Sequence, residues 1–417
     1  MRRKLRVTFL LMITLIPLLL YSDSLTLWYD GLVAELPYRE EHVKLVEENA
    51  RKVGLNLKKD YGPASLEDSI QRFIIQGKTG SPDVLETLLE HIYILSNADL
   101  ICPLNKYWEN YEKKDSFYES TVEAVTIDGN LYAIPHNVNV RLLLYRKSIF
   151  EKYGLSIPQT WEDLIKTGSW ITQNVPDTAG FALTTKFRDV RSFQEFMSFY
   201  FQLNENMFIT EGESITLAAS PEQLIQVLKL YEELFQSGAI PSKNKGISWQ
   251  ELDYGYTSGK YAMIPCGPWI WQHKEEGNPI AEEIIEDTGI VILPIADNGE
   301  KRTYMEVRGF VINNYSKNKD DAWKLATILV SEGMEKFKLL NKGNLSARKD
   351  IMEEYGTWWS KAFAENIKYG VVLDPINWDK ATVAISNAIQ YVVYNKMSAE
   401  EAGNWLYKEL SDIAKSL

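Results

Sequence analysis

Cysteine and histidine are scarce in this chain. Its 417 residues include only two cysteines, Cys102 and Cys266, and four histidines. Two cysteines cannot build the disulfide framework of a small secreted domain, and a chain of this length can bury a core without one. The histidines show no spacing typical of metal ligands. We expect no metal site and no cofactor, and two free, at least partly buried thiols, with a disulfide between Cys102 and Cys266 as the alternative.

Positive charge is also in short supply. The chain has 45 Lys and Arg against 57 Asp and Glu, which gives a formal net charge of -12. Nucleic acid needs a basic surface, so it is not an expected partner. Gly-x-Ser-x-Gly, His-Glu-x-x-His and Gly-x-Gly-x-x-Gly are all missing. The many acids leave the carboxylate pair of an exported glycoside hydrolase open as an alternative to a binding protein.

A long uncharged apolar run lies at the N-terminus. Val7–Leu20 follows the basic segment Met1–Arg6 and covers 14 residues. It is too short to span a membrane and has the length of a signal-peptide core. Ser22 and Ser24 are small residues that suit cleavage before Leu25. We expect residues 1–24 to be a signal peptide for the periplasm or another extracytoplasmic compartment, with an uncleaved membrane anchor as the alternative.

Strand and helix patterns alternate through the rest of the chain, which favours α/β layers. A helix is expected over Arg39–Val53, and N-capping residues mark helix starts at Ser65, Thr160, Ser220 and Ser398. No linker rich in Gly, Ser or Pro separates two domains. We therefore expect two domains joined by short ordered crossovers that act as a hinge. Strands are expected at Leu25–Tyr29, Asn130–Pro135, Leu142–Tyr145, Tyr261–Ile264, Gly289–Pro294 and Gly309–Asn313.

Two tryptophans follow a Gly-Pro turn. Trp269 and Trp271 come directly after Gly267-Pro268, which ends an apolar strand. Exposed indoles beside such a turn form a flat apolar platform on which a sugar ring stacks. The alternative is that both indoles belong to the core, where most large aromatic side chains lie.

Polar residues follow three of the expected strands. Asp30 comes after the first one, at the carboxyl end where open α/β sheets bind ligands. Glu86 and Glu90 follow Asp83–Leu85, and their carboxylates suit either sugar hydroxyls or a helix start. His136 and Asn139 follow Pro135, together with Asn137. An Asn side chain donates and accepts at once, as a hydroxyl does. Arg141 is expected to form a salt bridge at the hinge.

Seven segments in sequence order resemble one family. Each segment is a weak signal alone, but together they extend over about 320 residues. They resemble the extracellular solute-binding proteins of ABC importers, in the group that includes maltose-binding protein. The segments are Leu25–Gly31, Gly80–Val84, Asp128–Pro135, Leu144–Phe150, Pro158–Leu164, Ser258–Trp269 and Leu345–Lys349.

The resemblance implies the two-lobed periplasmic binding protein fold, type II, with a ligand cleft between lobes joined by crossovers. Lobe 1 would comprise residues 25–136 and 307–350, and lobe 2 residues 137–306 and 351–417. The protein would be the substrate-binding subunit of an ABC importer, a monomer that closes on a carbohydrate, with an oligosaccharide favoured and a non-sugar solute as an alternative. Its partners would be the permease subunits and their ATPase.

The resemblance also implies site residues. The family places a ligand contact at Asn139, a second stacking ring in the loop of Phe187 and Arg188, and late aromatic residues around Trp378. Maltose-binding proteins carry a Trp and an acidic residue where this chain has Glu86-Thr87 and Glu90-His91, so the resemblance implies Glu86, Thr87 and Glu90 as ligand contacts. The missing indole argues against maltose itself. Arg308 precedes Gly309 at the return crossover, and together with Arg188 it would suit an acidic sugar.

Overall fold

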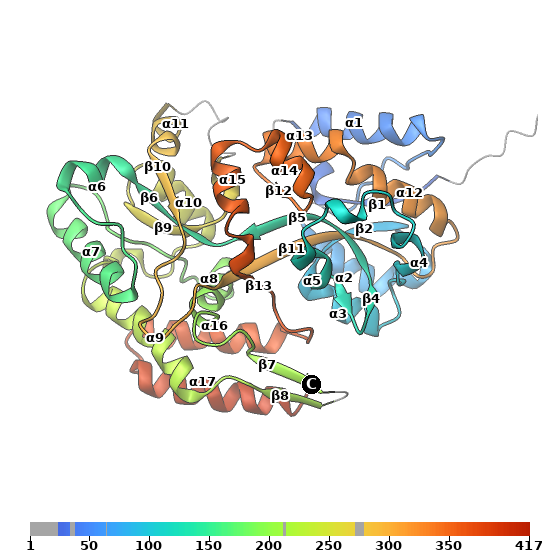
Figure 1. Cartoon of the computed structure of the whole chain (residues 1–417). Helices are drawn as coiled ribbons and strands as arrows, with labels where there is room; N and C mark the ends of the chain where they lie inside the picture. Colours follow the sequence, from blue (N-terminus) through green and yellow to red (C-terminus); the bar gives the residue numbers. More distant parts are fainter. Residues whose placement is uncertain (1–23, 34–37, 64, 212–213, 272–278) are drawn as a thin grey trace, which may run out of the picture.

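Two α/β lobes lie side by side in the computed structural model (Figure 1). The structure describes residues 24–33, 38–63, 65–211, 214–271 and 279–417. The expected signal peptide, apart from Ser24, lies outside these residues. None of the helices in these ranges is both long and apolar enough to cross a membrane.

The sheet of lobe 1 has six strands. Its order is β1-β2-β11-β5-β12, and β13 pairs with the far end of β11. β1 and β2 are parallel, whereas β11 runs antiparallel to both β2 and β5. The strands are β1 (Leu27–Trp28), β2 (Val84–Leu88), β5 (Ala133–Val140), β11 (Thr303–Ile312), β12 (Leu345–Ser346) and β13 (Gly370–Val371). The lobe's principal helices are α1 (Arg39–Lys52), α2 (Leu66–Gln76), α3 (Leu89–Asn97), α12 (Lys319–Leu329) and α13 (Glu332–Lys342).

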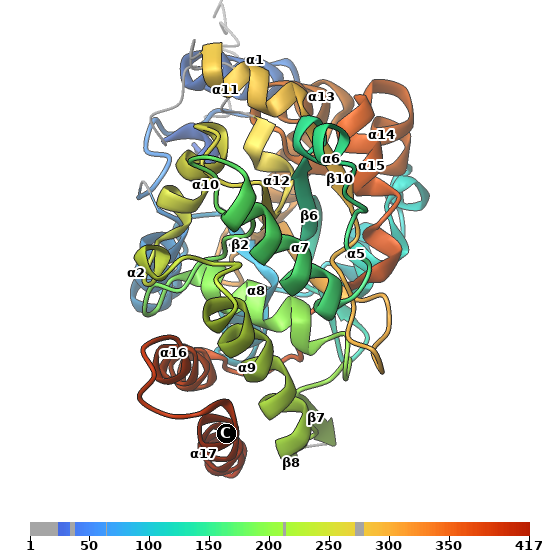
Figure 2. The same cartoon turned by 90° about the vertical axis from the view of Figure 1, so that its left-hand side faces the viewer.

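Lobe 2 is built on a smaller antiparallel sheet of order β10-β6-β9. Its strands are β6 (Leu142–Arg146), β9 (Met263–Cys266) and β10 (Thr288–Val291). The C-terminal helices α16 and α17 pack on α9 at the base of this lobe (Figure 2). The helices are α6 (Lys147–Tyr153), α7 (Trp161–Asn174), α8 (Val190–Tyr200), α9 (Pro221–Gln236), α10 (Trp249–Thr257), α11 (Pro279–Glu286), α16 (Asp379–Val393) and α17 (Ala399–Ala414).

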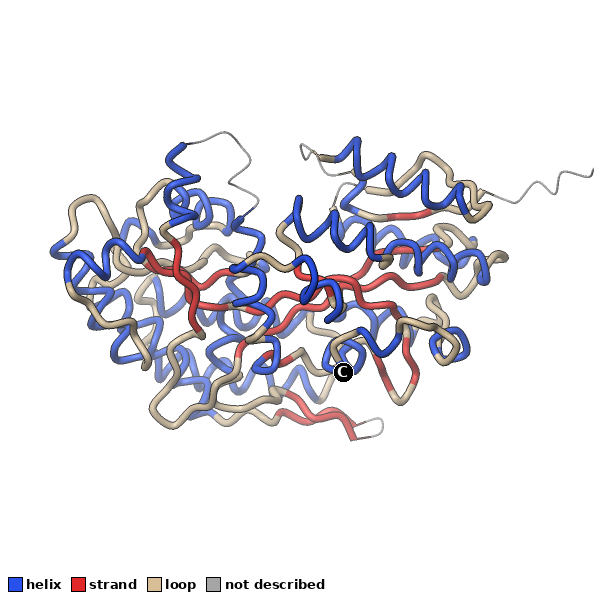
Figure 3. The backbone as a smooth tube through the Cα atoms, turned by 45° about the horizontal axis from the view of Figure 1, so that its top comes forward, coloured by secondary structure: helices blue, strands red, loops and turns tan. Residues whose placement is uncertain are grey.

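The two long strands β5 and β11 connect the lobes. In Figure 3 long strands run from one lobe into the other. The pairing of β5 with β11 extends from Ala133 and Val311 to Val140 and Met305, and a single residue, Arg141, separates β5 from β6. The lobe boundaries expected at residues 136 and 307 fall inside these two strands. The chain therefore passes between the lobes as a paired ribbon.

Smaller elements complete the fold. Two hairpins and several short helices extend the loops, and α14 and α15 follow β12. These elements are α4 (Asn105–Trp108), α5 (Glu119–Ala124), β3 (Thr126–Ile127), β4 (Asn130–Leu131), β7 (Phe208–Glu211), β8 (Ser214–Leu217), α14 (Lys349–Tyr355) and α15 (Trp358–Ala364).

The helix starts were predicted better than the strand ends. Thr160, Ser220 and Ser398 each form a full capping box, and Ser65 accepts from the backbone N–H of Asp68. The first strand is shorter than expected, because outside β1 Leu25 makes only an isolated bridge. The strand expected at Gly309–Asn313 is longer in the structure, because β11 begins at Thr303 and forms the crossover. Similarly, β9 lies two residues beyond the expected strand and β10 ends before Pro294.

Candidate ligand-binding cleft

Two neighbouring cavities lie between the lobes. The crossover cavity, of about 510 Å³, is lined by both crossover strands, by α2 and β2 of lobe 1, and by α8 and Trp269 of lobe 2. The helical cavity, of about 770 Å³, lies between α2 and α3 on one side and α8, α16 and α17 on the other. Leu88 and Val190 line both cavities. The two volumes are therefore adjoining parts of one interlobe cleft.

Polar side chains from the crossover ribbon line one wall of the crossover cavity. Asn137, Asn139 and Arg141 alternate along the chain, which places them on one face of an extended strand. Their partners on β11 are in register, with Glu306 opposite Asn139 and Arg308 opposite Asn137. The Nδ2 atom of Asn139 donates to Oε1 of Glu306 over 3.4 Å. Pairing of the two crossovers thus assembles this wall from distant parts of the sequence.

Ion pairs fix the charges on this wall. Arg308 donates from Nη1 to Oδ2 of Asp30 over 3.2 Å and from Nε to Oε1 of Glu306 over 3.1 Å. Arg141 contacts Glu306 from the other side, with Nη2 3.4 Å from Oε2. Burial raises the pKa of Glu306, but Arg308 and Arg141 outweigh it and hold that pKa below its ordinary value. Glu306 is therefore a carboxylate shared by two guanidinium groups.

Trp269 forms part of the opposite wall and is held in place. Its Nε1 donates to Oδ2 of Asp253 over 3.0 Å, and Asp253 also pairs with the buried Arg191. The indole lies against the backbone of Gly267, where an added Cβ would be 1.9 Å from its Cζ3. The guanidinium carbon of Arg141 lies 4.6 Å from the ring centroid. These contacts give a partly buried indole one fixed orientation at the cavity.

Several buried polar atoms on the cavity-lining residues have no hydrogen-bond partner within the described part of the chain. They are Oε2 of Glu86, the side-chain oxygens of Asn137 and Asn139, and the Nε and Nη1 atoms of Arg141. A buried polar group left unpaired destabilises a fold by about 1–3 kcal/mol. Such atoms gathered around one cavity indicate a polar ligand that supplies both donors and acceptors.

Glu86 is oriented from behind by His136. The Nε2 atom of His136 lies 2.9 Å from Oε1 of Glu86, and its Nδ1 lies 3.2 Å from Nζ of Lys338. The imidazole also stacks on Phe310 with a centroid distance of 4.4 Å. The other carboxylate oxygen of Glu86 remains for the cavity.

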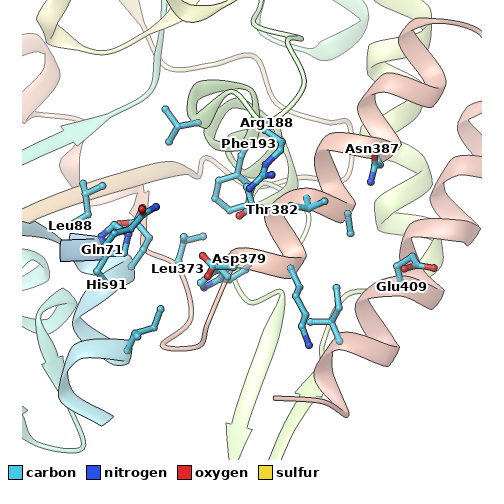
Figure 4. A pocket seen from close by; sticks show the side chains of 18 of the residues that line it. Gln71, Leu88, His91, Arg188, Phe193, Leu373, Asp379, Thr382, Asn387 and Glu409 are labelled. Atoms are coloured by element: carbon cyan, nitrogen blue, oxygen red, sulfur yellow. The ribbon is translucent and has the colours of Figure 1, made fainter. Parts of the chain in front are cut away.

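The helical cavity presents a different set of groups. In Figure 4, Arg188 and Phe193 lie near Thr382, with Leu88, Gln71 and His91 facing them. Glu90 lines this cavity and accepts from the hydroxyl of Tyr304. Burial, reinforced by Glu306, raises the pKa of Glu90 to about 7.

Comparison with known proteins identifies the family. Residues 45–336 match the family of bacterial extracellular solute-binding proteins. The chain belongs to this family. The match confirms the resemblance carried by the seven motifs.

Individual relatives of this solute-binding protein are distant. A binding protein of Brucella abortus is 23% identical over 299 residues, covering 70% of each chain. The galactooligosaccharide-binding protein of Bacillus subtilis is 21% identical over 337 residues, covering 78% of this chain and 71% of its own. The structure of maltose-bound MalE3 from T. maritima superposes with a TM-score of 0.78 at 19% identity, covering 94% of this chain and 99% of that one. This likeness confirms the two-lobed fold.

Of the residues predicted for the site of this solute-binding protein, eight line the cleft. They divide between its two cavities. Asp30, Glu86, Asn139, Trp269 and Arg308 line the crossover cavity. Glu90, Arg188 and Trp378 line the helical cavity. Trp378 is 5% exposed, so most of its ring packs inside lobe 2, against Phe193 and Phe208.

The other four predicted residues line neither cavity. Thr87 follows Glu86 in β2 and therefore points to the opposite face, where it is buried. His136 lies behind Glu86, and Phe187 is 46% exposed. Trp271 stacks on Trp359 at 5.1 Å in a buried aromatic cluster. Trp271 is therefore a core residue and does not form part of a sugar-stacking platform.

Prediction from sequence missed part of the polar wall. The sequence assigns no role to Asn137 or Glu306 and only a salt bridge to Arg141. Arg191 and Gln194 of α8 also line the crossover cavity. The alternation of Asn137, Asn139 and Arg141 was a usable signal, because it places all three on one strand face. Within the described residues, no cluster of three or more His, Cys, Asp or Glu side chains could hold a metal ion.

Proposed function

We propose that this protein binds a carbohydrate in the crossover cavity and serves as the substrate-binding subunit of an ABC importer. One observation carries the proposal. The residues that line this cavity combine an oriented indole, Trp269, with buried donors and acceptors that lack partners in the described protein. A sugar offers an apolar face to an indole and hydroxyl groups that both donate and accept.

The names of similar proteins support a carbohydrate. One relative is the galactooligosaccharide-binding protein of Bacillus subtilis, and the T. maritima structure contains maltose. The size of the cleft supports more than one sugar ring, because the two adjoining cavities measure about 510 and 770 Å³. We therefore favour an oligosaccharide.

Binding would shift an equilibrium between open and closed lobes. A ligand that contacts both lobes binds the closed form more tightly and so populates it. Asp30 on lobe 1 and Trp269 on lobe 2 provide such contacts. We expect a dissociation constant of about 1 μM, which corresponds to roughly -8 kcal/mol. A monomer delivered outside the cytoplasmic membrane by its signal peptide would then pass the sugar to permease subunits driven by an ATPase.

A thermal-shift screen of mono- and oligosaccharides tests this function. We expect at least one sugar to raise the melting temperature and to be recovered unchanged after incubation. Stabilisation by peptides, polyamines or other solutes alone would contradict the carbohydrate assignment and leave the fold intact. Release of shorter sugars would instead support the hydrolase alternative.

A further inference from the structure

The crossover cavity is lined by three arginines, Arg141, Arg191 and Arg308. Arginine grips a carboxylate with two parallel N–H donors, taken from either of two edges of the guanidinium plane. One edge pairs Nε with Nη2, and the other pairs Nη1 with Nη2. The cavity can therefore bind an acidic sugar in this way only if the two donors of one edge are not already bound to protein groups.

Arg191 and Arg308 have no edge that is free of protein partners. Arg191 donates from Nε to Glu195, from Nη1 to Asp253 and from Nη2 to the carbonyl of Pro265. Arg308 uses Nε for Glu306 and Nη1 for Asp30, so one nitrogen of each edge is already bound to a protein carboxylate.

Arg141 retains donors, but they are not paired. Its Nη2, which belongs to both edges, contacts Gln194 and Glu306. The two nitrogens without a partner in the described protein are Nε and Nη1. These two nitrogens do not share an edge, so the pair does not match a carboxylate.

The remaining unpartnered atoms oppose negative charge. Oε2 of Glu86 and the side-chain oxygens of Asn137 and Asn139 are acceptors that require donors from the ligand. The charged residues that line the cavity are also balanced in number, with three arginines and the three acids Asp30, Glu86 and Glu306. An added carboxylate would lack a counter-charge there and would lie near these acids.

We infer that the crossover cavity recognises a neutral sugar and excludes a uronic acid. This inference rests on the proposed carbohydrate function and specifies the chemical class of the ligand. It replaces the acidic sugar that Arg308 suggested in the sequence, because the structure engages Arg308 with protein carboxylates.

Matched neutral and acidic probes test the inference. The neutral set is maltotriose, cellotriose, mannotriose and galactotriose, and the acidic set is trigalacturonic acid, trimannuronic acid and cellobiouronic acid. Thermal shift followed by calorimetric titration should find a neutral sugar that binds at least 10-fold more tightly than any acid. Its affinity should change less than 2-fold between 50 and 500 mM salt, since no charge pair is formed with the ligand.

Glu306→Gln provides an independent measurement. It removes the negative charge shared by Arg141 and Arg308, and the weakened contacts release donors for a carboxylate. We expect trigalacturonic acid to bind the variant at least 10-fold more tightly than the native protein, whereas the exposed control Glu109→Gln should leave its affinity unchanged.

Three results would overturn the inference. Tighter binding of any uronic acid than of every neutral sugar would show that the native cavity accepts the charge. An unchanged affinity of folded Glu306→Gln for trigalacturonic acid would show that engaged arginines are not the cause of exclusion. Failure of both probe sets would overturn the carbohydrate function itself, a result distinct from a preference for acids.

Discussion

His136 and Glu86 are in direct contact beneath the crossover cavity, with each residue only 2% exposed. The imidazole bridges the Glu86 carboxylate and Lys338, and so holds in place an acceptor that lines the cavity. His136→Phe keeps an aromatic ring but removes this hydrogen bond. We expect it to weaken sugar binding and to lower the free energy of unfolding by about 1.5–3 kcal/mol.

The test combines ligand titration with denaturant unfolding. His136→Gln, which retains a side-chain donor, should recover part of the affinity. If His136→Phe binds sugar as tightly as the native protein while folded, orientation by His136 does not contribute to recognition.

Mutation of Trp269 should mainly affect sugar binding, whereas mutation of Trp271 should mainly affect stability. Trp269→Ala removes an apolar surface at the cavity and should weaken sugar binding by about 1–3 kcal/mol. Trp271→Ala opens a space in the cluster with Trp359 and should lower the free energy of unfolding by about 3–5 kcal/mol. Calorimetric unfolding and titration of both variants measure the two effects.

The relative stability of the two variants distinguishes a cavity residue from a core residue. The loss of the Asp253 hydrogen bond should make Trp269→Ala somewhat less stable, but by less than Trp271→Ala. A Trp269→Ala protein that is largely unfolded, with full affinity in the folded fraction, would identify Trp269 as a core residue.

Glu90 should make stability depend on pH. Its pKa is raised from 4.5 to about 7 in the folded protein, so the folded state holds its proton more tightly than the unfolded chain does. Its contribution to stability is therefore present below pH 4.5 and is lost as the pH rises to about 7. Glu90→Gln should lose this dependence, and its melting temperature relative to the native protein should rise between pH 4.5 and pH 8.

Unfolding scans across that range check the prediction. The exposed variant Glu109→Gln should follow the native curve at every pH. A constant difference between Glu90→Gln and the native protein would mean that Glu90 does not titrate in this range.

The two cysteines should behave as protected thiols. Cys102 and Cys266 are both buried and free, and burial raises the pKa of each thiol. A thiol reagent should react slowly with the native protein and should count two thiols per chain after denaturation without reductant. A count of zero would indicate a covalent link between the lobes.

Local chemistry made the helix starts readable from the sequence. Ser220-Pro221 predicts a start that the structure places at Pro221, because capping and a proline at the first turn involve only neighbouring residues. The site was only partly readable. Asp30 and Trp269 follow strand ends, a local signal, whereas the link from Asp30 through Arg308 to Glu306 depends on the register of distant strands.

The tryptophan pair shows why the direction of a side chain is harder to predict from sequence than the position of a turn. Residues 268–271 form a short 3₁₀ turn. Each residue of such a turn rotates by about 120°, so side chains two positions apart face different surroundings. The sequence Gly267-Pro268 indicated a turn but did not specify its type. Trp269 therefore lies at the cavity and Trp271 lies in the core.

The paired crossover has a mechanical consequence. A two-stranded ladder resists sliding, because displacement would break its hydrogen bonds, but it twists readily. Atoms near such a pivot travel least when the lobes swing. Asn139 and Glu306, opposite one another on the ribbon, would keep their spacing at every lobe angle. An arriving sugar would meet the same pattern of polar groups at any degree of opening, and Trp269 of lobe 2 would determine how long it stays bound.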